Sequence, residues 1–303
     1  MEKQSLNGNW SMSTGKGNNR IPAIIPGSVY STLLAAGEMA DPFYRDNEMA
    51  ALARMEEDYT FTRKFDVPES LLNLDRILLR CEGLDTLATI RLNGQVIGET
   101  ANMHRIWEFE VTDLLRGSEN EIEIAFASPT KFIRETYAEH PYEGSPDAMK
   151  GFVHLRKAHY MFGWDWGARL PDAGIWRDIS LIGFEHARFG NIYIRQRHSE
   201  GKVALSLDVE LDLVDIQPYE VKISVTAPDG SRIEGTDQEP LIIPNPALWW
   251  PHGLGEQPLY TVRAELFLEG KVLDTWQRRI GLRTLTVRRE KDRWGESFCH
   301  RIN

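Results

Sequence analysis

An aliphatic residue stands at every second position in the stretch Val203-Ala204-Leu205-Ser206-Leu207-Asp208-Val209-Glu210-Leu211-Asp212-Leu213. Successive side chains of a β-strand point to opposite faces, so a period of two predicts a strand with one face in a core. The pattern is the most regular one in the chain. It indicates a β-strand here, and similar alternation on either side predicts further strands.

The residues that follow continue as short strands. Residues 219–226 are expected to pair with this first strand, and Pro228-Asp229-Gly230 has the composition of a tight turn. Residues 260–268 and 272–276 form a further predicted hairpin. About seven short strands in roughly a hundred residues are typical of an immunoglobulin-like β-sandwich, which we place at residues 185–285.

The N-terminal part also shows alternation and turns. Residues 87–92 and 95–97 flank Asn93-Gly94, the strongest hairpin signal in the chain, because a type I′ turn needs positive φ at both central positions. Further alternating sets begin at Tyr59, Ile77, Trp107 and Ile122. Short strands at this spacing predict an antiparallel sandwich. Earlier in the chain, Ser28 is predicted to cap a short helix that carries Val29, Leu33 and Leu34.

Residues 130–171 leave this pattern as a long excursion, and its aromatic content is high. The sequence reaches Tyr160-Met161-Phe162-Gly163-Trp164-Asp165-Trp166-Gly167-Ala168-Arg169-Leu170-Pro171-Asp172-Ala173-Gly174-Ile175-Trp176. Loops of this length are usually functional or disordered, and the aromatic residues argue against disorder. Indole rings cover the apolar faces of a sugar while a carboxylate such as Asp165 accepts hydrogen bonds from its hydroxyls. The alternative is a loop whose tryptophans plug the end of a sandwich.

The composition narrows the possible partners. The chain has 45 acidic and 35 basic residues, a net charge of −10, which argues against a nucleic acid. Cys81 and Cys299 stand far apart, and His154 and His159 lack the helical spacing of zinc ligands, so no metal and no cofactor are predicted. Residues 1–8 lack the apolar core of a signal peptide, and no apolar run approaches the roughly twenty residues of a membrane span. We therefore expect a cytoplasmic protein without a membrane partner.

Several motifs along the chain resemble the N-terminal part of β-mannosidases of glycoside hydrolase family 2. The most diagnostic is Phe162-Gly163-Trp164-Asp165-Trp166-Gly167 after Arg156-Lys157, which is similar to the β-mannosidase branch of that family. The other motifs are Leu6-Asn7-Gly8-Asn9-Trp10, Ile25-Pro26-Gly27-Ser28-Val29, Asp41-Pro42-Phe43-Tyr44 with Asn47-Glu48, Leu92-Asn93-Gly94, Gly174-Ile175-Trp176-Arg177, Leu248-Trp249-Trp250-Pro251-His252-Gly253 and Gly281-Leu282-Arg283-Thr284.

The resemblance implies an all-β chain with a jelly-roll, galactose-binding-like sandwich at residues 1–184 and the immunoglobulin-like sandwich at residues 185–285. It also implies a catalytic (β/α)8 barrel, which carries both catalytic carboxylates in the family and is expected to be absent from this chain. Residues 286–303 resemble the lead-in to that barrel. No catalytic residue is assigned, because the Asn-Glu pairs Asn47-Glu48 and Asn120-Glu121 both lie in the sandwich region. Asn47-Glu48 is expected in a structured loop.

The resemblance also implies a role for the aromatic motif. Asp165 would reach into the active site of the barrel and bind hydroxyls of the terminal non-reducing sugar. Trp164 and Trp166 would line that pocket or brace the loop, with one residue in each role. Arg156 and Lys157 would either keep Asp165 ionised or lie on the surface.

The function implied by the resemblance is that of the accessory part of a retaining exo-β-mannosidase. Its substrate would be a terminal β-D-mannose residue of an oligosaccharide or glycan, and its partner the barrel of the same protein. The 303 residues alone are expected to be inactive. Two alternatives stay open: another specificity of family 2, such as an exo-β-glucosaminidase or an endo-β-mannosidase, and a freestanding carbohydrate-binding module.

Overall fold

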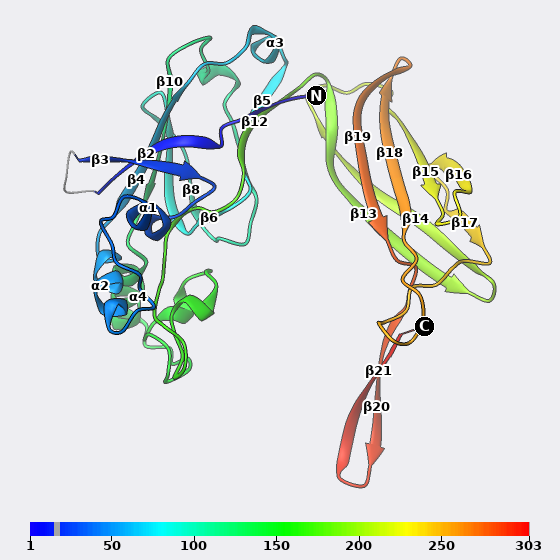
Figure 1. The fold of residues 1–303 in the computed structure, drawn as a ribbon. Helices are drawn as coiled ribbons and strands as arrows, with labels where there is room; N and C mark the ends of the chain where they lie inside the picture. The colour runs from blue at the N-terminus through cyan, green and yellow to red at the C-terminus, as the bar shows by residue number, and fades with distance from the viewer. Residues whose placement is uncertain (15–18, 303) are drawn as a thin grey trace. The chain divides into compact units, whose positions relative to one another are not determined.

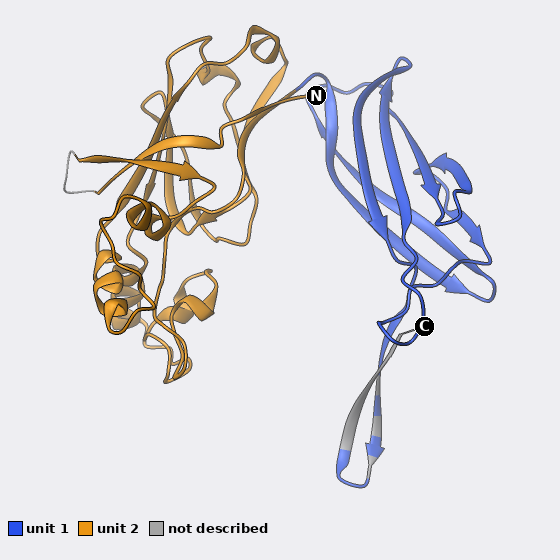
Figure 2. Cartoon of the chain, in the orientation of Figure 1, with its two compact units in different colours: residues 1, 184–303 blue, residues 2–183 orange. Residues whose placement is uncertain are grey.

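The computed structural model describes residues 1–14 and 19–302. The chain divides into two compact units, which Figure 2 shows in different colours: residues 2–183, and residue 1 together with residues 184–303. They are called here the N-terminal sandwich and the C-terminal sandwich. Sheets dominate both units, which confirms the all-β class predicted from the sequence.

Two sheets form the N-terminal sandwich, which is a jelly-roll (Figure 1). The six-stranded sheet has the order β3 (Arg20–Ile25), β2 (Gly8–Thr14), β4 (Tyr59–Phe65), β10 (Asn120–Phe126), β7 (Leu87–Leu92) and β8 (Gln95–Ala101). The four-stranded sheet has the order β1 (Glu2–Ser5), β12 (Ile179–Phe184), β5 (Arg76–Cys81) and β9 (Trp107–Glu110). A short pair is formed by β11 (Gly174–Ile175) and β6 (Leu84–Asp85).

Alternating side chains of these strands form one core. Along β10, Ile122, Ile124 and Phe126 are buried while the residues between them are partly exposed. Phe126 meets Phe61 of β4 edge to face, with ring centroids 5.9 Å apart. Burying one such side chain contributes about 1.5 to 3 kcal/mol. Because apolar residues recur at every second position, they all lie on one face of the sheet, and burying them stabilises the packing of that face on the core.

The turn between β7 and β8 has the conformation that its sequence predicts. Asn93 and Gly94 have φ angles of 52° and 84°, the positive values that a type I′ turn requires. Asn93 Nδ2 donates to Asn120 Oδ1 at 3.0 Å, and Asn93 Oδ1 accepts from the backbone N–H of Glu121 at 2.9 Å. The Asn-Gly turn thereby also fixes the start of β10.

Short helices connect the strands of the N-terminal sandwich. They are α1 (Val29–Ala35), α2 (Asn47–Arg54), α3 (Glu69–Leu72), α4 (Pro129–Glu139) and the 3-10 helices η1 (Thr112–Leu114), η2 (Phe152–His154) and η3 (His159–Met161). Ser28 caps α1 as predicted. Its Oγ accepts from the Ser31 backbone N–H at 3.2 Å, and Ser31 Oγ accepts from the Ser28 backbone N–H at 2.8 Å, a capping box.

Helix α4 corrects the prediction of an irregular excursion from residue 130. Ser128 caps the helix by accepting from the Lys131 backbone N–H at 3.1 Å, and Pro129 stands in the first turn, where its missing N–H leaves no bond unmade. Among its large apolar side chains only Ile133 is buried. The helix is thus indicated by its Ser-Pro start and not by an apolar stripe, which is why periodicity did not predict it.

Two sheets also form the C-terminal sandwich, which is immunoglobulin-like. One sheet has the order β13 (Ala187–Ser199), β14 (Lys202–Leu213) and β17 (Leu241–Pro244). The other has the order β16 (Arg232–Thr236), β15 (Glu220–Thr226), β18 (Tyr260–Leu268) and β19 (Lys271–Ile280). The apolar face of β14 is buried at Val203, Leu205 and Leu207, and becomes more exposed toward Leu213.

The structure corrects one predicted pairing. Strand β15 does not pair with β14; it joins β16 and β18 in the opposite sheet. The partners of β14 are β13, connected to it by a tight turn at Gly201 with φ of 68°, and β17. Alternation predicts that a strand has one buried face, but two sheets share that core, and the sequence pattern does not distinguish between them.

Residues 285–302 form a separate hairpin of β20 (Leu285–Asp292) and β21 (Gly295–Ile302). It pairs with no other strand of the described residues. A two-stranded hairpin of this kind is only marginally stable by itself in water.

Raising the pH is expected to destabilise the N-terminal sandwich through Tyr59. This side chain is 2% exposed and donates to the Arg54 carbonyl at 3.1 Å. Burial raises the pKa of Tyr59 from 10.0 to about 12. The unfolded chain therefore releases this proton first, and the free energy of unfolding should fall as the pH rises from about 10 toward about 12.

Chemical denaturation at a series of alkaline pH values measures this effect. Tyr59→Phe should show a shallower fall in the free energy of unfolding than the unchanged protein, because the titrating group is gone. Tyr142→Phe, which removes a hydroxyl from a side chain that is 69% exposed, is the matched control and should keep the original slope. Equal slopes for all three proteins would contradict the prediction.

Candidate functional site

The aromatic motif folds into a tight turn at the end of a short antiparallel ribbon. The backbone N–H of Trp164 donates to the Gly167 carbonyl at 3.0 Å, and the N–H of Gly167 donates back to the Trp164 carbonyl at 3.3 Å. Asp165 and Trp166 are the two residues between them. They therefore stand at the tip of the ribbon, which is called here the Asp165 turn (residues 164–167).

A small hydrophobic cluster supports the ribbon. The cluster, called here the satellite core, is separate from the main core of the sandwich and consists of Ile133, Ala148, Phe152, Leu155 and Phe162. Phe162 lies in the ribbon itself and is fully buried, with its ring centroid 6.1 Å from that of Phe152. Helix α4 contributes Ile133. The long excursion is thus ordered because it has a core of its own.

The three tryptophans of the stretch divide into two groups. Trp166 is 82% exposed and Trp164 is 41% exposed, and their ring centroids lie 5.6 Å apart at 49°. Neither plugs the sandwich. Trp176 is partly buried and packs so closely on Gly83 that a Cβ there would lie 2.6 Å from the indole nitrogen. Trp176 therefore packs against the sandwich, as the alternative interpretation expected of the tryptophans. Trp164 and Trp166 are instead exposed, as expected of residues that contact a sugar.

Both tryptophans of the turn line a cavity of about 350 Å³. Its other lining residues are Ala148, Phe152, His159, Tyr160, Gly163 and Gly167. Most of this wall is apolar or aromatic, which suits the C–H faces of a sugar ring. Asp165 is exposed and is not part of the lining, so the structure does not bring the carboxylate and the two indole rings to one cavity.

The two basic residues of the motif lie in different environments. Arg156 is exposed, and its carbonyl accepts from the Met103 backbone N–H at 3.0 Å. Lys157 has a fully buried side chain, forms an ion pair with Asp85 of β6, and donates to the Asp172 carbonyl at 2.6 Å. Within the described residues, neither forms an ion pair with Asp165. Lys157 was expected either to lie on the surface or to keep Asp165 ionised. Both expectations were wrong, because its side chain is buried and pairs with Asp85.

Burial dominates the electrostatics of this lysine. Loss of hydration lowers the pKa of the Lys157 ammonium, and the neighbouring charges of Asp85 and Asp172 oppose that change. Burial likewise raises the pKa of Asp172, whose Oδ1 accepts backbone hydrogen bonds from Tyr30 and Ala173 at 3.0 and 2.8 Å. These groups join β6 and α1 to the segments on either side of the ribbon. Their role is therefore structural: they stabilise the segments that carry the turn.

Glu48 contacts the candidate site, although the sequence indicated it only as part of a family motif and assigned it no role there. Asn47 and Glu48 open helix α2, which corrects the expectation of a loop. Glu48 Oε1 accepts from the backbone N–H of Arg169, in the second arm of the ribbon, at 2.9 Å. The two residues are 121 positions apart. No local pattern connects them, so only the fold reveals the contact.

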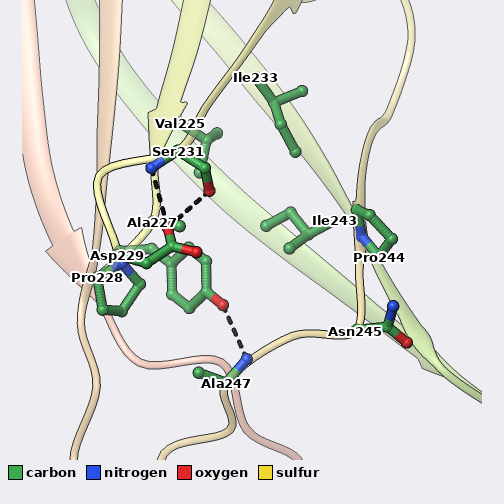
Figure 3. A pocket seen from close by; sticks show the side chains of 11 residues that line it. Val225, Ala227, Pro228, Asp229, Ser231, Ile233, Ile243, Pro244, Asn245 and Ala247 are labelled. Atoms are coloured by element: carbon green, nitrogen blue, oxygen red, sulfur yellow. Dashed lines mark hydrogen bonds between the residues drawn. The ribbon is translucent and has the colours of Figure 1, made fainter.

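A second cavity of about 350 Å³ lies in the C-terminal sandwich, and Figure 3 shows its side chains. Asp229 accepts from the backbone N–H and the hydroxyl of Ser231 at 2.9 and 2.7 Å, within the predicted Pro228-Asp229-Gly230 turn. The hydroxyl of Tyr260 accepts from the Ala247 backbone N–H at 2.9 Å. These polar groups hold the turn and the neighbouring loop, so the Asp165 turn is the better candidate for a ligand site.

No group of three or more histidine, cysteine, aspartate or glutamate side chains in the described residues is placed to hold a metal ion. Of the helices in the same residues, none combines the length and the apolar character needed to cross a membrane.

Comparison with known families assigns both sandwiches to one class. Residues 10–177 match the family described as glycosyl hydrolase 2 galactose-binding domain-like, and residues 187–283 match glycosyl hydrolases family 2. The chain belongs to glycosyl hydrolase family 2.

Individual relatives within this family are β-mannosidases. Beta-mannosidase B of Aspergillus niger is 34% identical over 298 residues, and the match covers 92% of this chain and 34% of that protein. The β-mannosidase of Rattus norvegicus is 27% identical, with 99% and 37% covered. The crystal structure of a β-D-mannosidase from Dictyoglomus thermophilum superposes with a TM-score of 0.92 at 36% identity, covering all of this chain and 39% of that one. The chain thus spans little more than a third of the length of these relatives.

Proposed function

We propose that this chain is the N-terminal accessory part of a retaining exo-β-mannosidase that removes terminal non-reducing β-D-mannose residues from oligosaccharides or glycans. The observation that carries the proposal is the displayed Trp164-Asp165-Trp166 tip, in a chain whose relatives are named β-mannosidases. The exposed carboxylate of Asp165 offers hydrogen-bond acceptors at the tip of the turn, and the indole rings on either side of it in sequence offer apolar faces toward the cavity. A pyranose presents the complementary groups.

The proposed catalytic machinery lies outside these residues. Retaining hydrolysis uses two carboxyl groups about 5 to 5.5 Å apart, one as acid/base and one as nucleophile. We place both in a (β/α)8 barrel that would follow residue 303, and we interpret residues 286–303 as the lead-in to it. The separate β20–β21 hairpin supports this interpretation, because its strands pair with no other described strand.

The proposal gives each residue of the motif a role. Asp165 accepts hydrogen bonds from hydroxyls of the terminal sugar and closes the pocket of an exo-acting enzyme. Trp164 and Trp166 supply aromatic walls on the side of the 350 Å³ cavity. Arg156 is exposed on the same excursion and adds positive charge near the site. The cytoplasmic location expected from the N-terminal sequence stays a prediction.

The proposal is tested by reading the gene sequence beyond residue 303 and by expressing and assaying the longer protein that it encodes. The longer protein should continue with an alternating strand and helix pattern and should hydrolyse an aryl β-mannoside faster than an aryl β-glucosaminide. The 303-residue protein should be inactive. The opposite order of substrates would favour another family 2 specificity. A reading frame that stops at residue 303, in a protein that binds mannose tightly without hydrolysis, would favour the freestanding module.

A further inference from the structure

We infer that Glu48 is a positioning residue, which holds the Asp165 turn where its carboxylate meets the sugar hydroxyls. This inference rests on the function proposed for Asp165. Glu48 belongs to the first turn of α2, and the turn it would position belongs to a ribbon more than a hundred residues later. The contact between them is one hydrogen bond to the backbone of Arg169, together with a longer ion pair to its guanidinium.

The pairing pattern of the ribbon explains why this bond matters. Phe162 and Arg169 stand opposite each other. The backbone hydrogen bonds across the ribbon run from Leu170 to Met161 on one side of this pair and, two positions away on the other side, between Trp164 and Gly167. Phe162 and Arg169 do not exchange hydrogen bonds with each other. In a non-hydrogen-bonded antiparallel pair, the N–H and C=O groups of both residues point away from the partner strand. The outward N–H of Arg169 donates to Glu48 Oε1 at 2.9 Å.

The opposite side of the ribbon is fixed at the same level. The outward carbonyl of Phe162 accepts from the Met149 backbone N–H at 3.0 Å. The ribbon is therefore held on both sides directly below the turn, by a backbone group on one side and by the carboxylate of Glu48 on the other. A carboxylate makes the stronger kind of hydrogen bond, because its charge assists the bond.

The side chain of Arg169 completes this support. Its Nη2 donates to the Asp147 carbonyl at 3.1 Å, and its Nη1 lies 4.0 Å from Glu48 Oε1. Its Cγ packs against the other arm so closely that a Cβ at Gly163, where φ is 87°, would lie 2.5 Å away. Several contacts thus hold the base of the ribbon, and among them Glu48 bonds the backbone of the second arm. Removing the Glu48 contact takes away the outer backbone hydrogen bond of the arm that leads to Asp165 and loosens that arm.

Hydrogen exchange in the 303-residue protein tests the mechanical part of the inference. Glu48→Ala should speed exchange of the backbone amides of residues 164–170 by about tenfold, the effect of losing one hydrogen bond to a charged group. Glu48→Gln keeps an oxygen acceptor and should stay close to the unchanged protein. Glu139→Ala, at the exposed end of α4, is the control. Unchanged exchange in Glu48→Ala would overturn the inference.

Kinetics of the longer protein test the functional part. Glu48→Ala should lower kcat/KM for an aryl β-mannoside by about 10- to 100-fold, because small misplacements of a binding group have effects of this size. Glu48→Gln should restore most of the loss. The double variant Glu48→Ala with Asp165→Ala should be no slower than Asp165→Ala alone, because Glu48 acts through Asp165.

The outcomes separate the two proposals. Asp165→Ala with unchanged kinetics, or a longer protein without glycosidase activity, would defeat the proposed function, and the exchange data would still decide whether Glu48 holds the turn. An impaired Asp165→Ala beside a fully active Glu48→Ala would overturn the inference alone. Additive losses in the double variant would also overturn it, because they would show that Glu48 acts independently of Asp165.

Discussion

Replacing Lys157 with methionine is expected to lower the free energy of unfolding of the N-terminal sandwich by about 3 to 5 kcal/mol, the usual effect of removing one partner from a buried ion pair. Asp85, which is 4% exposed, would lose its ammonium partner. The Asp172 carbonyl would lose the donor that lies 2.6 Å away. The methionine stem replaces most of the volume, so the effect is electrostatic more than steric.

Chemical denaturation of the 303-residue protein measures this effect, provided that signals of the two sandwiches are followed separately. Lys64→Met, on the exposed face of β4, removes a lysine without a buried partner and is the matched control. Combining Lys157→Met with Asp85→Asn should recover part of the stability, because no charge is then left buried. Equal stability of the Lys157 and Lys64 variants would show that the buried pair does not stabilise the fold.

Replacing Asp165 with alanine is expected to reduce the activity of the proposed longer enzyme while leaving the fold intact. Two hydrogen bonds from sugar hydroxyls to a carboxylate are worth about 1.5 to 3 kcal/mol each, so kcat/KM for an aryl β-mannoside should fall by about 10²- to 10⁴-fold. The side chain is exposed and makes no hydrogen bond within the described residues. The free energy of unfolding should therefore change little.

Steady-state kinetics beside a denaturation curve separate these effects. Asp165→Asn keeps one oxygen acceptor and loses the charge, so its kcat/KM should lie between those of the unchanged enzyme and the alanine variant. Asp113→Ala, an exposed aspartate in η1 of the same sandwich, should leave the kinetics unchanged. If Asp165→Ala were as active as Asp113→Ala, the sugar-binding role of the turn would be wrong.

The architecture was predictable where a local pattern carries the information. Alternation along residues 203–213 gave a strand with a buried face, and Asn93-Gly94 gave a hairpin with positive φ at both positions. The pairing of β15 was not predictable in this way, since a strand of one sandwich can join either sheet. Helix α4 was missed because only its Ser-Pro start indicates a helix.

The sequence indicated the motif of the candidate site, and it did not indicate the long-range contacts that support the motif. Trp164, Asp165 and Trp166 stand out by residue type, and the structure displays all three. Arg156 and Lys157 are adjacent and similar in sequence, yet one is exposed and the other buried, a difference that arises from Asp85 more than seventy residues earlier. A contact between residues so far apart in the chain cannot be predicted from local patterns in a single sequence.

The separate satellite core has a consequence for how this protein would fail on heating. Five side chains hold the ribbon, while the sheets are held by a much larger core. A small cluster of this kind opens at a lower free energy than the strands around it. In the proposed longer enzyme, thermal inactivation should then precede melting: substrate binding at the Asp165 turn would be lost while circular dichroism still reports intact sheets, and an apparently folded sample would already be inactive.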